Sequence, residues 1–477
     1  MRELTTEARR HGGEEGRGKA REGEREREWE GVKTVSFHTF GCRLNQYDTE
    51  AIREEVLALG YTEVPADEPA AVHVVNTCAV TADSGVKARR HIQRIARRRP
   101  ECRIVVVGCS TPLEKERLAR IPQVAFLAGN EEKDMVASFL NGGWKPGEPF
   151  PARGKTSLGS RISRYADHTR ANIKVQDGCD RFCSFCVIPF LRGRSRSRDP
   201  REVVEEVGRL VENGYRELVI TGVHLQDYGL DLSPPSSLAA LLRDVAAAAG
   251  GSRVRLSSIG ARSFRPELLD VLEHPAFCPH WHIPLQSGSD AVLERMRRDH
   301  GVSEMRDVVG SLRERFEEPS ITTDIIVGHP GESAADFEMT LEAARDLRFA
   351  KIHVFPYSAR EGTLAWKLGG HVDALEVRRR ARALRALEAE LALEFRASFV
   401  GRGVRVLVER GSASREGFAG PEASESVLGG LTERYLRVRF EAPSEPARER
   451  FPGTFQDVVV ESAGETEAWG RWQGVDP

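Results

Sequence analysis

The alternation of apolar and polar positions divides the chain into stretches with different expected secondary structure. Between residues 32 and 140, short apolar runs alternate with stretches of helical periodicity. The expected strands are KTVSFHTF, AAVHVVNTC and CRIVVVGC, and the expected helices span 48–59 and 84–99. Strands that alternate with helices predict a parallel α/β sheet in this N-terminal domain.

The same alternation resumes between residues 166 and 399. Six expected strands follow one another as ANIKVQ, ELVITGV, RVRLSSI, HWHIPL, TTDIIVG and AKIHVF, with helices between them at 200–213, 237–248 and 290–298. Such units predict an open (βα)6 barrel, a relative of the full eight-fold barrel. Residues 373–399 are rich in Ala, Leu, Arg and Glu at helical spacing, which indicates one long trailing helix.

The rest of the chain differs from these two domains. Residues 400–465 contain short β runs and Gly-rich turns, which predict a small all-β barrel. We expect a linker at 141–165, a disordered tail rich in Arg, Glu and Gly at 1–31, and a short tail at 466–477. A chain of 477 residues fits about three domains of ordinary size.

Composition narrows the possible functions. The 70 basic and 72 acidic residues give a net charge of −2, so the overall field does not attract nucleic acid, and RNA binding would depend on local Arg-rich stretches. No apolar run of about 18 residues and no signal peptide occur, so we expect a cytoplasmic protein without a membrane partner. Eight cysteines are too few for a disulfide scaffold, which favours metal or redox chemistry.

Three of these cysteines share one loop. Cys179, Cys183 and Cys186 lie in QDGCDRFCSFCVIP, directly after the first strand of the expected barrel. Three thiolates at this spacing can hold a 4Fe–4S cube and leave one iron open to a substrate or cofactor. The alternatives are three unrelated buried cysteines and a zinc site, but zinc usually takes a fourth protein ligand in a structural site.

A second set of cysteines is spread along the N-terminal domain. Cys42, Cys78 and Cys109 each follow an expected strand, and the carboxyl ends of parallel strands meet at one edge of a sheet. Spacing alone leaves open that these three are small buried packing residues. Cys102 and Cys278 fit neither set, so we expect them to serve only in packing.

These motifs resemble those of a known family. The CxxxCxxC loop, with Phe185 before its last cysteine, resembles the radical S-adenosylmethionine superfamily. TFGCRLNQYDTE, VVNTCAVT and VVGCST resemble the N-terminal domain of the methylthiotransferases. ITGVHLQDYG, IPLQSGSDAVLERM and DIIVGHPGES resemble their radical core, and GLTERYLRVRF resembles their RNA-binding TRAM barrel. The resemblance covers about residues 32 to 465 in the expected order.

The resemblance implies two 4Fe–4S clusters and S-adenosylmethionine as cofactors. The cluster at Cys179, Cys183 and Cys186 would bind and cleave S-adenosylmethionine, and the N-terminal cluster would carry the sulfur to be inserted. Four further residues would bind the cofactor. Phe185 would lie along its adenine, Gly222 would let the backbone approach its amino group, and Gln286 and Ser287 would make polar contacts. Core packing for Phe185 and a routine turn for Gly222 remain the alternatives.

Several arginines stand close to the expected clusters. Arg192, Arg194, Arg196 and Arg198 follow the cysteine loop without an intervening acid. We expect Arg192 and Arg194 to act at the catalytic centre, where they would hold a carboxylate, a sulfur species or a phosphate, rather than form a solvated face. The basic helix at 84–99 is a second candidate for contact with RNA. In the C-terminal barrel the candidates are Arg434, Tyr435, Arg437 and Arg439.

The family contains enzymes that act on tRNA and enzymes that act on a ribosomal protein. Arg43-Leu44-Asn45 stands where the isopentenyladenosine branch has QMN, so the chain most resembles the branch that acts on threonylcarbamoyladenosine. His329 and Gly260 depart from that branch, where phenylalanine and an acidic residue are usual.

The expected function is methylthiolation of threonylcarbamoyladenosine at C2, next to the anticodon. The expected partners are a tRNA anticodon stem-loop and an electron donor of the flavodoxin or ferredoxin type. The sequence does not identify the sulfur donor. The alternatives are an isopentenyladenosine tRNA methylthiotransferase, a ribosomal-protein aspartate methylthiotransferase and a non-catalytic RNA-binding homologue.

Overall fold

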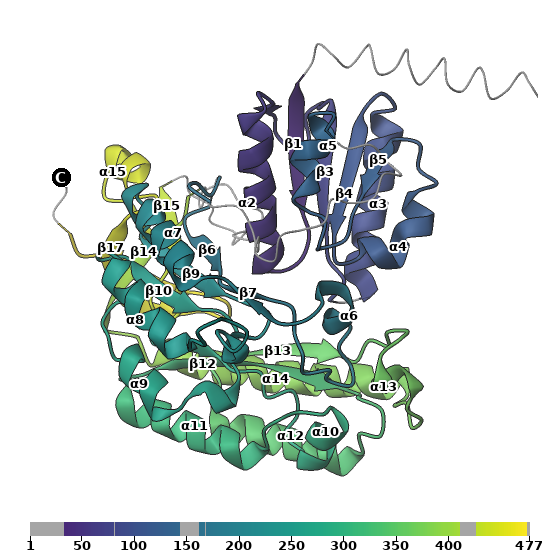
Figure 1. Ribbon diagram of the computed structural model, residues 1–477. Helices are drawn as coiled ribbons and strands as arrows, with labels where there is room; N and C mark the ends of the chain where they lie inside the picture. The colour runs from purple at the N-terminus through teal and green to yellow at the C-terminus, as the bar shows by residue number, and fades with distance from the viewer. Residues whose placement is uncertain (1–32, 81, 144–161, 167, 411–425, 475–477) are drawn as a thin grey trace, which may run out of the picture.

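The computed structural model describes residues 33–80, 82–143, 162–166, 168–410 and 426–474. The expected tail at 1–31 and most of the expected linker lie outside these residues. The described chain forms an N-terminal sheet domain, a central domain with parallel strands and a C-terminal barrel (Figure 1).

The N-terminal domain is a five-stranded sheet of order β2-β1-β3-β4-β5 in which all neighbouring strands are parallel. Its strands are β1 (Thr34–Thr39), β2 (Thr62–Glu63), β3 (Val72–Thr77), β4 (Arg103–Gly108) and β5 (Val124–Leu127). Helices α2 (Arg43–Ala58) and α5 (Met135–Leu140) cover one face, while α3 (Ala82–Arg98) and α4 (Thr111–Leu118) cover the other. Both faces are buried, which explains why the central strands are continuous apolar runs.

Helix α2 begins five residues earlier than its apolar spacing predicts, so that Cys42 occupies the position before its first turn. The added turn contains Asn45, which is buried, and Asp48 directly follows it, also buried. Polar residues on a buried helix face hide the helical periodicity from sequence analysis. Both residues reappear below as parts of the functional site.

Three histidines of this domain contact one another between the sheet and α3. His91 Nε2 lies 3.0 Å from His38 Nδ1, and His38 Nε2 lies 3.3 Å from His73 Nδ1. Burial lowers the pKa of His38 to about 3, with contributions from His91, His73 and Arg94. Burial likewise lowers the pKa of His73 to about 4, helped by Arg99 and His91.

We expect the N-terminal domain to lose stability as the pH falls from about 6.5 to 5. In this range the histidines bind protons in the unfolded chain but not in the folded one. The free energy of unfolding therefore decreases as the pH is lowered. Each of the two residues should contribute about 2 kcal/mol to this loss. Urea denaturation of the cluster-free chain at several pH values, monitored by hydrogen exchange of the β1 and β3 amides, measures this loss of stability. A His73→Gln variant should flatten the pH dependence, whereas the exposed His274→Gln control should keep it, and equal slopes would refute the account.

The central domain contains six parallel strands arranged as a partial barrel. They are β6 (Ala171–Lys174), β9 (Glu217–Thr221), β10 (Arg253–Leu256), β11 (His280–His282), β12 (Ser320–Val327) and β13 (Lys351–Pro356). Strands β6, β9 and β10 pair in one half and β11, β12 and β13 in the other, and a bridge from Val254 to Phe277 links the halves. The prediction of an open (βα)6 barrel is confirmed.

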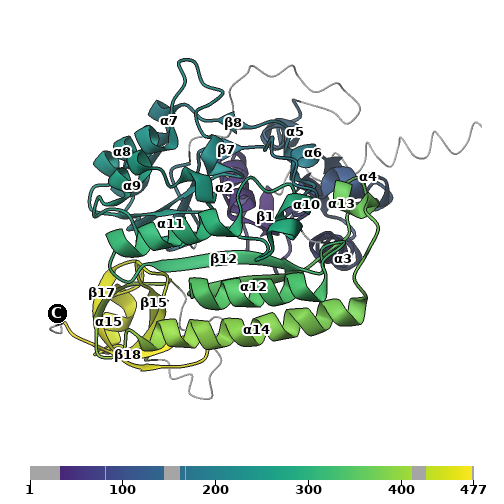
Figure 2. The ribbon, with the colours of Figure 1, turned by 90° about the horizontal axis from the view of Figure 1, so that it is seen from below.

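Helices pack outside these strands and enclose the largest apolar core of the described chain. They include α7 (Pro200–Glu212), α8 (Leu238–Ala248), α9 (Pro266–Leu272), α11 (Val302–Arg315) and α12 (Ala334–Leu347). The expected long helix is α14 (Ala374–Ala397), which packs against β13 and runs beside α12 to the C-terminal barrel (Figure 2).

The described end of the expected linker is packed rather than free. Ile162 and Tyr165 are fully buried in the core of the central domain. The backbone N–H groups of Ser163 and Arg164 both donate to Glu54 Oε1 at 2.7 Å, and Glu54 belongs to α2. Residues 162–165 therefore connect the N-terminal domain to the central one through direct contacts.

The C-terminal domain is a closed five-stranded barrel, as predicted, but it extends further than expected. Its strands are β14 (Gly403–Val408), β15 (Val427–Leu431), β16 (Arg437–Glu441), β17 (Phe455–Ala463) and β18 (Ala468–Trp472). The expected boundary at residue 465 and the tail at 466–477 are wrong, because β18 pairs with β16 and β17 to close the barrel. Only Ala468 of β18 is buried, so this strand lacks a clear alternating pattern. In the described ranges, no helix is long and apolar enough to span a membrane.

Candidate functional site

The N-terminal cysteines lie together at the carboxyl edge of their sheet. Cys42 follows β1, Cys78 follows β3 and Cys109 follows β4. A side chain at Gly41 would come within 2.5 Å of Cys78 Sγ, so the loop before Cys42 touches Cys78. Burial raises the pKa of Cys78, and the neighbouring Cys42 and Cys109 raise it further. The structure thus brings together three thiols that are about 30 residues apart in the sequence.

The second triad occupies a tight loop after β6 and β7 (Gln176–Asp177). Gly178 has a φ of +75°, and an added Cβ would lie 1.9 Å from the Arg194 carbonyl oxygen, so only glycine fits there. Burial raises the pKa of Cys186 to about 12, and Cys183 and Cys179 raise it further. The Cys186 thiol is therefore protonated in the metal-free protein, and metal binding must release its proton.

A short helix connects the two triads. Helix α6 (Ile188–Arg192) starts two residues after Cys186 and lies between the N-terminal and central domains (Figure 1). Val187 and Leu191 pack in one apolar cluster with Ala79 and Cys109. Asn130 Nδ2 donates both to Cys109 Sγ at 3.2 Å and to the Leu191 carbonyl at 3.0 Å. The loop that follows the second triad thus touches the first.

Arg192 ends α6 inside a buried charge network, with only 2% of its side chain exposed. Its Nη1 donates to both oxygens of Asp177, at 2.8 and 3.0 Å, and its Nη2 donates to Asn45 Oδ1 at 2.7 Å. Burial opposes the charge, but Asp177, Cys109 and Asp48 raise the pKa of the guanidinium well above its ordinary value. Arg192 therefore lies beside the N-terminal triad and links two domains.

Asp48 occupies the other side of this network. It forms ion pairs with Lys133 of its own domain and with Lys174 of β6, the latter at 2.6 Å. Burial opposes ionisation, but Lys133, Lys174 and Arg192 hold the pKa of Asp48 well below its usual range. Sequence analysis missed Asn45, Asp48 and Asp177. The sequence feature that could have revealed them is a polar residue at a position that helical or strand spacing places on the buried face.

The other arginines of the predicted row do not share one site. The Arg194 side chain is 83% exposed and pairs with Asp180 at 2.5 Å. Arg198 is buried and pairs with Glu206 at 3.0 Å in the core. The prediction of a single functional row is therefore wrong, because Arg198 is a core residue and the Arg194 side chain lies in solvent.

The residues expected to bind the cofactor differ in whether contacts within the protein already occupy them. Gly222 is closely packed, since an added Cβ would lie 2.8 Å from Leu225 and 2.9 Å from Gln176 Oε1. Gln286 has a φ of +72°, and its buried Oε1 has no hydrogen-bond partner among the described residues. Such an orphaned polar atom fits a ligand contact. The Ser287 hydroxyl instead accepts from the Ser289 N–H at 3.2 Å, and Phe185 is half-buried in the cysteine loop.

Both positions that depart from the expected branch lie close to neighbouring side chains. His329 Nε2 lies 3.1 Å from the hydroxyl of Ser184, inside the second cysteine loop, and burial lowers the pKa of His329 to about 4. A side chain at Gly260 would lie 2.4 Å from Gln226 Oε1. Cys102 and Cys278 are buried and belong to neither triad.

A cavity of about 1000 Å³ opens where the three domains meet. Cys42 and Arg43 border it from the N-terminal domain, and Gly222 borders it from the central one. Its other polar lining residues include Thr221, Ser257, His282, Asp324, Lys351, His353, Arg434 and Arg437. The volume is that of an ordinary small-molecule site.

Tyr435 inserts from the C-terminal barrel into this junction rather than facing outward. Its ring stacks on His280 with centroids 4.8 Å apart, and its hydroxyl accepts from Arg43 at 3.1 Å. Burial raises the pKa of Tyr435, but Arg43, Arg170 and Arg255 outweigh burial and lower it to about 8. Tyr435 therefore lines the cavity and does not lie on an outward face of the barrel, and its contact with RNA stays a prediction.

Arg439, expected on the same RNA-facing surface, is buried and pairs with Glu467 at 2.8 Å. Glu467 lies directly before β18, beyond the expected end of the barrel at residue 465.

Comparison with known families agrees with this division of the chain. Residues 173–344 match the radical SAM superfamily, and residues 34–129 match a family described as uncharacterized protein family UPF0004. The matched ranges are the central partial barrel and the N-terminal sheet. The fold and the cysteine loop therefore define a radical S-adenosylmethionine enzyme.

Relatives narrow the class to one family. A threonylcarbamoyladenosine tRNA methylthiotransferase MtaB of Bacillus subtilis is 34% identical over 416 residues, 86% of this chain and 90% of the relative. The protein of the same name from Thermotoga maritima is 37% identical over 86% of this chain and 92% of its own length. A tRNA-2-methylthio-N(6)-dimethylallyladenosine synthase of Acidothermus cellulolyticus is 35% identical over 80% and 79%. The chain belongs to the radical S-adenosylmethionine methylthiotransferases.

The cofactors of this family are two 4Fe–4S clusters and S-adenosylmethionine. The donor sets fit them, because each triad offers three soft thiols and no fourth ligand, which leaves one iron of each cube open. The second triad would hold the cluster at which S-adenosylmethionine binds, and the cofactor would supply there a radical that can remove hydrogen from an unactivated carbon. The residues of the chain position the two triads, border the cavity and exclude water from the buried junction at α6.

Proposed function

We propose that this protein transfers a methylthio group to C2 of threonylcarbamoyladenosine next to the anticodon of tRNA. One observation carries the proposal. Two cysteine triads are joined through α6, and Cys42 of the first borders a cavity that all three domains line. Four relatives at 34–37% identity have names that specify this reaction.

Residue roles follow from their positions. Cys42, Cys78 and Cys109 would hold the sulfur-carrying cluster, and Cys179, Cys183 and Cys186 the cluster that binds S-adenosylmethionine. Phe185, Gly222 and Gln286 would contact that cofactor. Ser287 would shape the Gln286 turn, since its hydroxyl is used within the protein. Arg192 would hold the N-terminal and central domains in position. Arg194, whose side chain is exposed to solvent, would contribute little to the reaction.

The polarity of the cavity favours the threonylcarbamoyl group over the isopentenyl group. Its lining includes histidines, Lys351 and several arginines. An isopentenyl chain offers no hydrogen bonds, so those polar groups would lose water without compensation. A threonylcarbamoyl group carries a carboxylate, a hydroxyl and amide groups that can bond with them.

An anaerobic reaction tests the proposal directly. The reconstituted protein, S-adenosylmethionine and a flavodoxin- or ferredoxin-type electron donor are mixed with anticodon stem-loops that carry either modified adenosine. We expect mass spectrometry to find the methylthio product only on threonylcarbamoyladenosine. Product on isopentenyladenosine alone, or on a ribosomal protein and neither RNA, would overturn it. A tRNA substrate also implies a cytoplasmic location.

Exposed arginines on α3 are the best candidates for contact with the tRNA backbone. Replacing Arg90, Arg97 and Arg98 with Glu should weaken tRNA binding by at least about 10-fold. The slope of log K against the logarithm of the salt concentration should become shallower by about two to three. Replacing the exposed Arg378, Arg382 and Arg385 of α14 with Glu changes the net charge equally and serves as the control. Titrations at several salt concentrations measure both slopes, and equal effects of the two triple variants would contradict a specific RNA face.

A further inference from the structure

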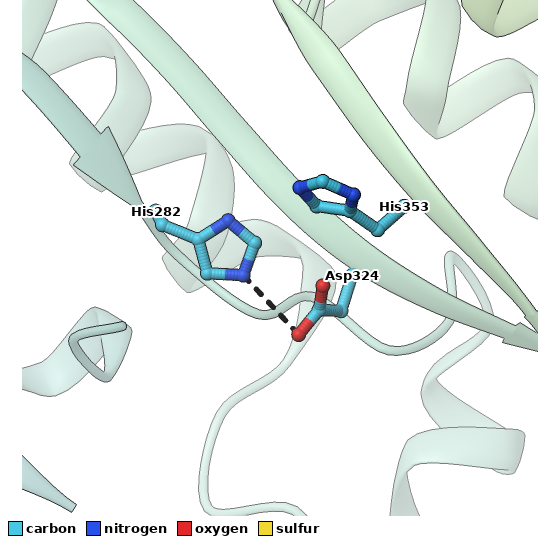
Figure 3. A group of neighbouring side chains, drawn as sticks. All are labelled: His282, Asp324 and His353. Carbon is cyan, nitrogen blue, oxygen red and sulfur yellow. Dashed lines mark ion pairs between the residues drawn. The ribbon is translucent and has the colours of Figure 1, made fainter. Parts of the chain in front are cut away.

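Two histidines and a carboxylate converge on the cavity side of the central barrel (Figure 3). His282 ends β11, Asp324 lies in β12 and His353 lies in β13. Asp324 is the register partner of His353, and His282 is opposite Thr322, two residues before Asp324. Because side chains alternate along strands, all three project from the same face of the sheet. One ligand atom from each lies within 4.8 Å of the others.

The geometry resembles a prepared metal site. His282 Nε2 lies 3.2 Å from Asp324 Oδ2. The other ring nitrogen, His282 Nδ1, lies 2.9 Å from Thr322 Oγ1. In the tautomer that donates Nδ1–H to Thr322 Oγ1, the lone pair of Nε2 is directed toward the Asp324 carboxylate. Metal-binding histidines are usually oriented by such a partner on the second ring nitrogen. Two imidazoles and one carboxylate on one face leave the opposite coordination positions open.

The surrounding charges favour a cation. Lys351, two residues before His353 in β13, is paired with Glu388 of α14 at 2.8 Å. Asp324 contributes a negatively charged carboxylate to this group of ligand atoms. This charge attracts a metal ion and repels the carboxylate of a threonylcarbamoyl group.

We propose that His282, Asp324 and His353 bind one first-row divalent metal cation, whose open coordination positions face the cavity. The cation reverses the local charge and gives the substrate carboxylate an attractive partner. This second role rests on the proposed function, whereas metal binding itself does not.

Manganese binding to the cluster-loaded protein tests the site. Oxidised 4Fe–4S cubes are EPR-silent, so the signal of free Mn²⁺ reports binding directly. We expect one Mn²⁺ per chain in the wild type. Thr322→Val removes only the residue that orients His282, so it should weaken Mn²⁺ binding by ~10–100-fold. His353→Asn and Asp324→Asn remove proposed ligands and should weaken it by more than that. His274→Gln is the matched control because this exposed histidine lies outside the cavity.

Iron content confirms that each variant is folded and loaded. If the wild type binds no Mn²⁺, or if the His353 and Asp324 variants bind it as tightly as the wild type, the site does not exist. If the His274 control weakens binding equally, the ion is adventitious, which also overturns the proposal.

A second titration separates metal binding from the reaction. Mn²⁺ should strengthen binding of a stem-loop with threonylcarbamoyladenosine by at least ~10-fold but leave one with unmodified adenosine unchanged. Equal effects on both would refute the role in substrate binding. If threonylcarbamoyladenosine is methylthiolated at the same rate with and without Mn²⁺, this role also fails while the proposed function stands.

Discussion

Replacement of Cys179, Cys183 and Cys186 with Ala is expected to abolish both cleavage of S-adenosylmethionine and transfer of the methylthio group. One four-iron cube per triad gives about eight irons per chain, so the iron content should fall by about half. The residual iron belongs to the N-terminal triad, which this change does not touch. Iron analysis and detection of 5′-deoxyadenosine after anaerobic reduction measure the two effects.

The reciprocal variant is the sharpest control. With Cys42, Cys78 and Cys109 replaced by Ala, iron should again fall by about half, but 5′-deoxyadenosine should still form because the second triad is intact. The methylthio product should disappear. Replacing Cys102 or Cys278 should leave both the iron content and the product unchanged, since neither lies in a triad. Equal iron in all these variants would rule out the assignment of clusters to triads.

Arg192→Gln is expected to uncouple the two halves of the reaction. Removing the guanidinium leaves Asp177 buried without its main partner and breaks the contact with Asn45 of α2. Loss of one partner of a buried ion pair costs about 3–5 kcal/mol, here concentrated at the junction of two domains. Because small displacements at a reacting centre cost about 100-fold in rate, we expect methylthio transfer to fall by at least that factor.

Arg194→Gln is the matched control for this change. Its side chain is 83% exposed, and exposed ion pairs contribute about 0–1 kcal/mol, so activity should stay within about two-fold of the wild type. Hydrogen exchange in α2 and α6 should rise in Arg192→Gln but not in Arg194→Gln. If Arg192→Gln retains transfer, or if it loses 5′-deoxyadenosine formation in the same proportion, Arg192 does not act by positioning the N-terminal triad.

The sequence predicted what repeats in a simple period. The order of three domains, the six barrel strands and α14 were all visible because apolar residues recur at strand or helix spacing. The convergence of Cys42, Cys78 and Cys109 was also predictable, since the ends of parallel strands meet at one sheet edge. Strand β18 was missed because its one buried residue, Ala468, forms no pattern.

What the sequence concealed are contacts between residues far apart in the chain. Arg192 and Arg194 look equivalent as letters, and only the turn at Gly193 separates a buried link from an exposed side chain. Tyr435 reads as a surface residue of a barrel, yet it is stacked on His280 across a domain boundary. The group of His282, Asp324 and His353 depends on the register of three strands, which the spacing of residues along the chain does not determine.

Mass spectrometry of tRNA nucleosides from a strain that lacks this gene tests the central claim most directly. The methylthio derivative of threonylcarbamoyladenosine should disappear, its unmethylthiolated precursor should accumulate, and the methylthio derivative of isopentenyladenosine should be unchanged. The wild-type gene should restore the product, and a gene with either triad replaced by Ala should not. An unchanged nucleoside profile, or loss of the isopentenyladenosine product instead, would contradict the account.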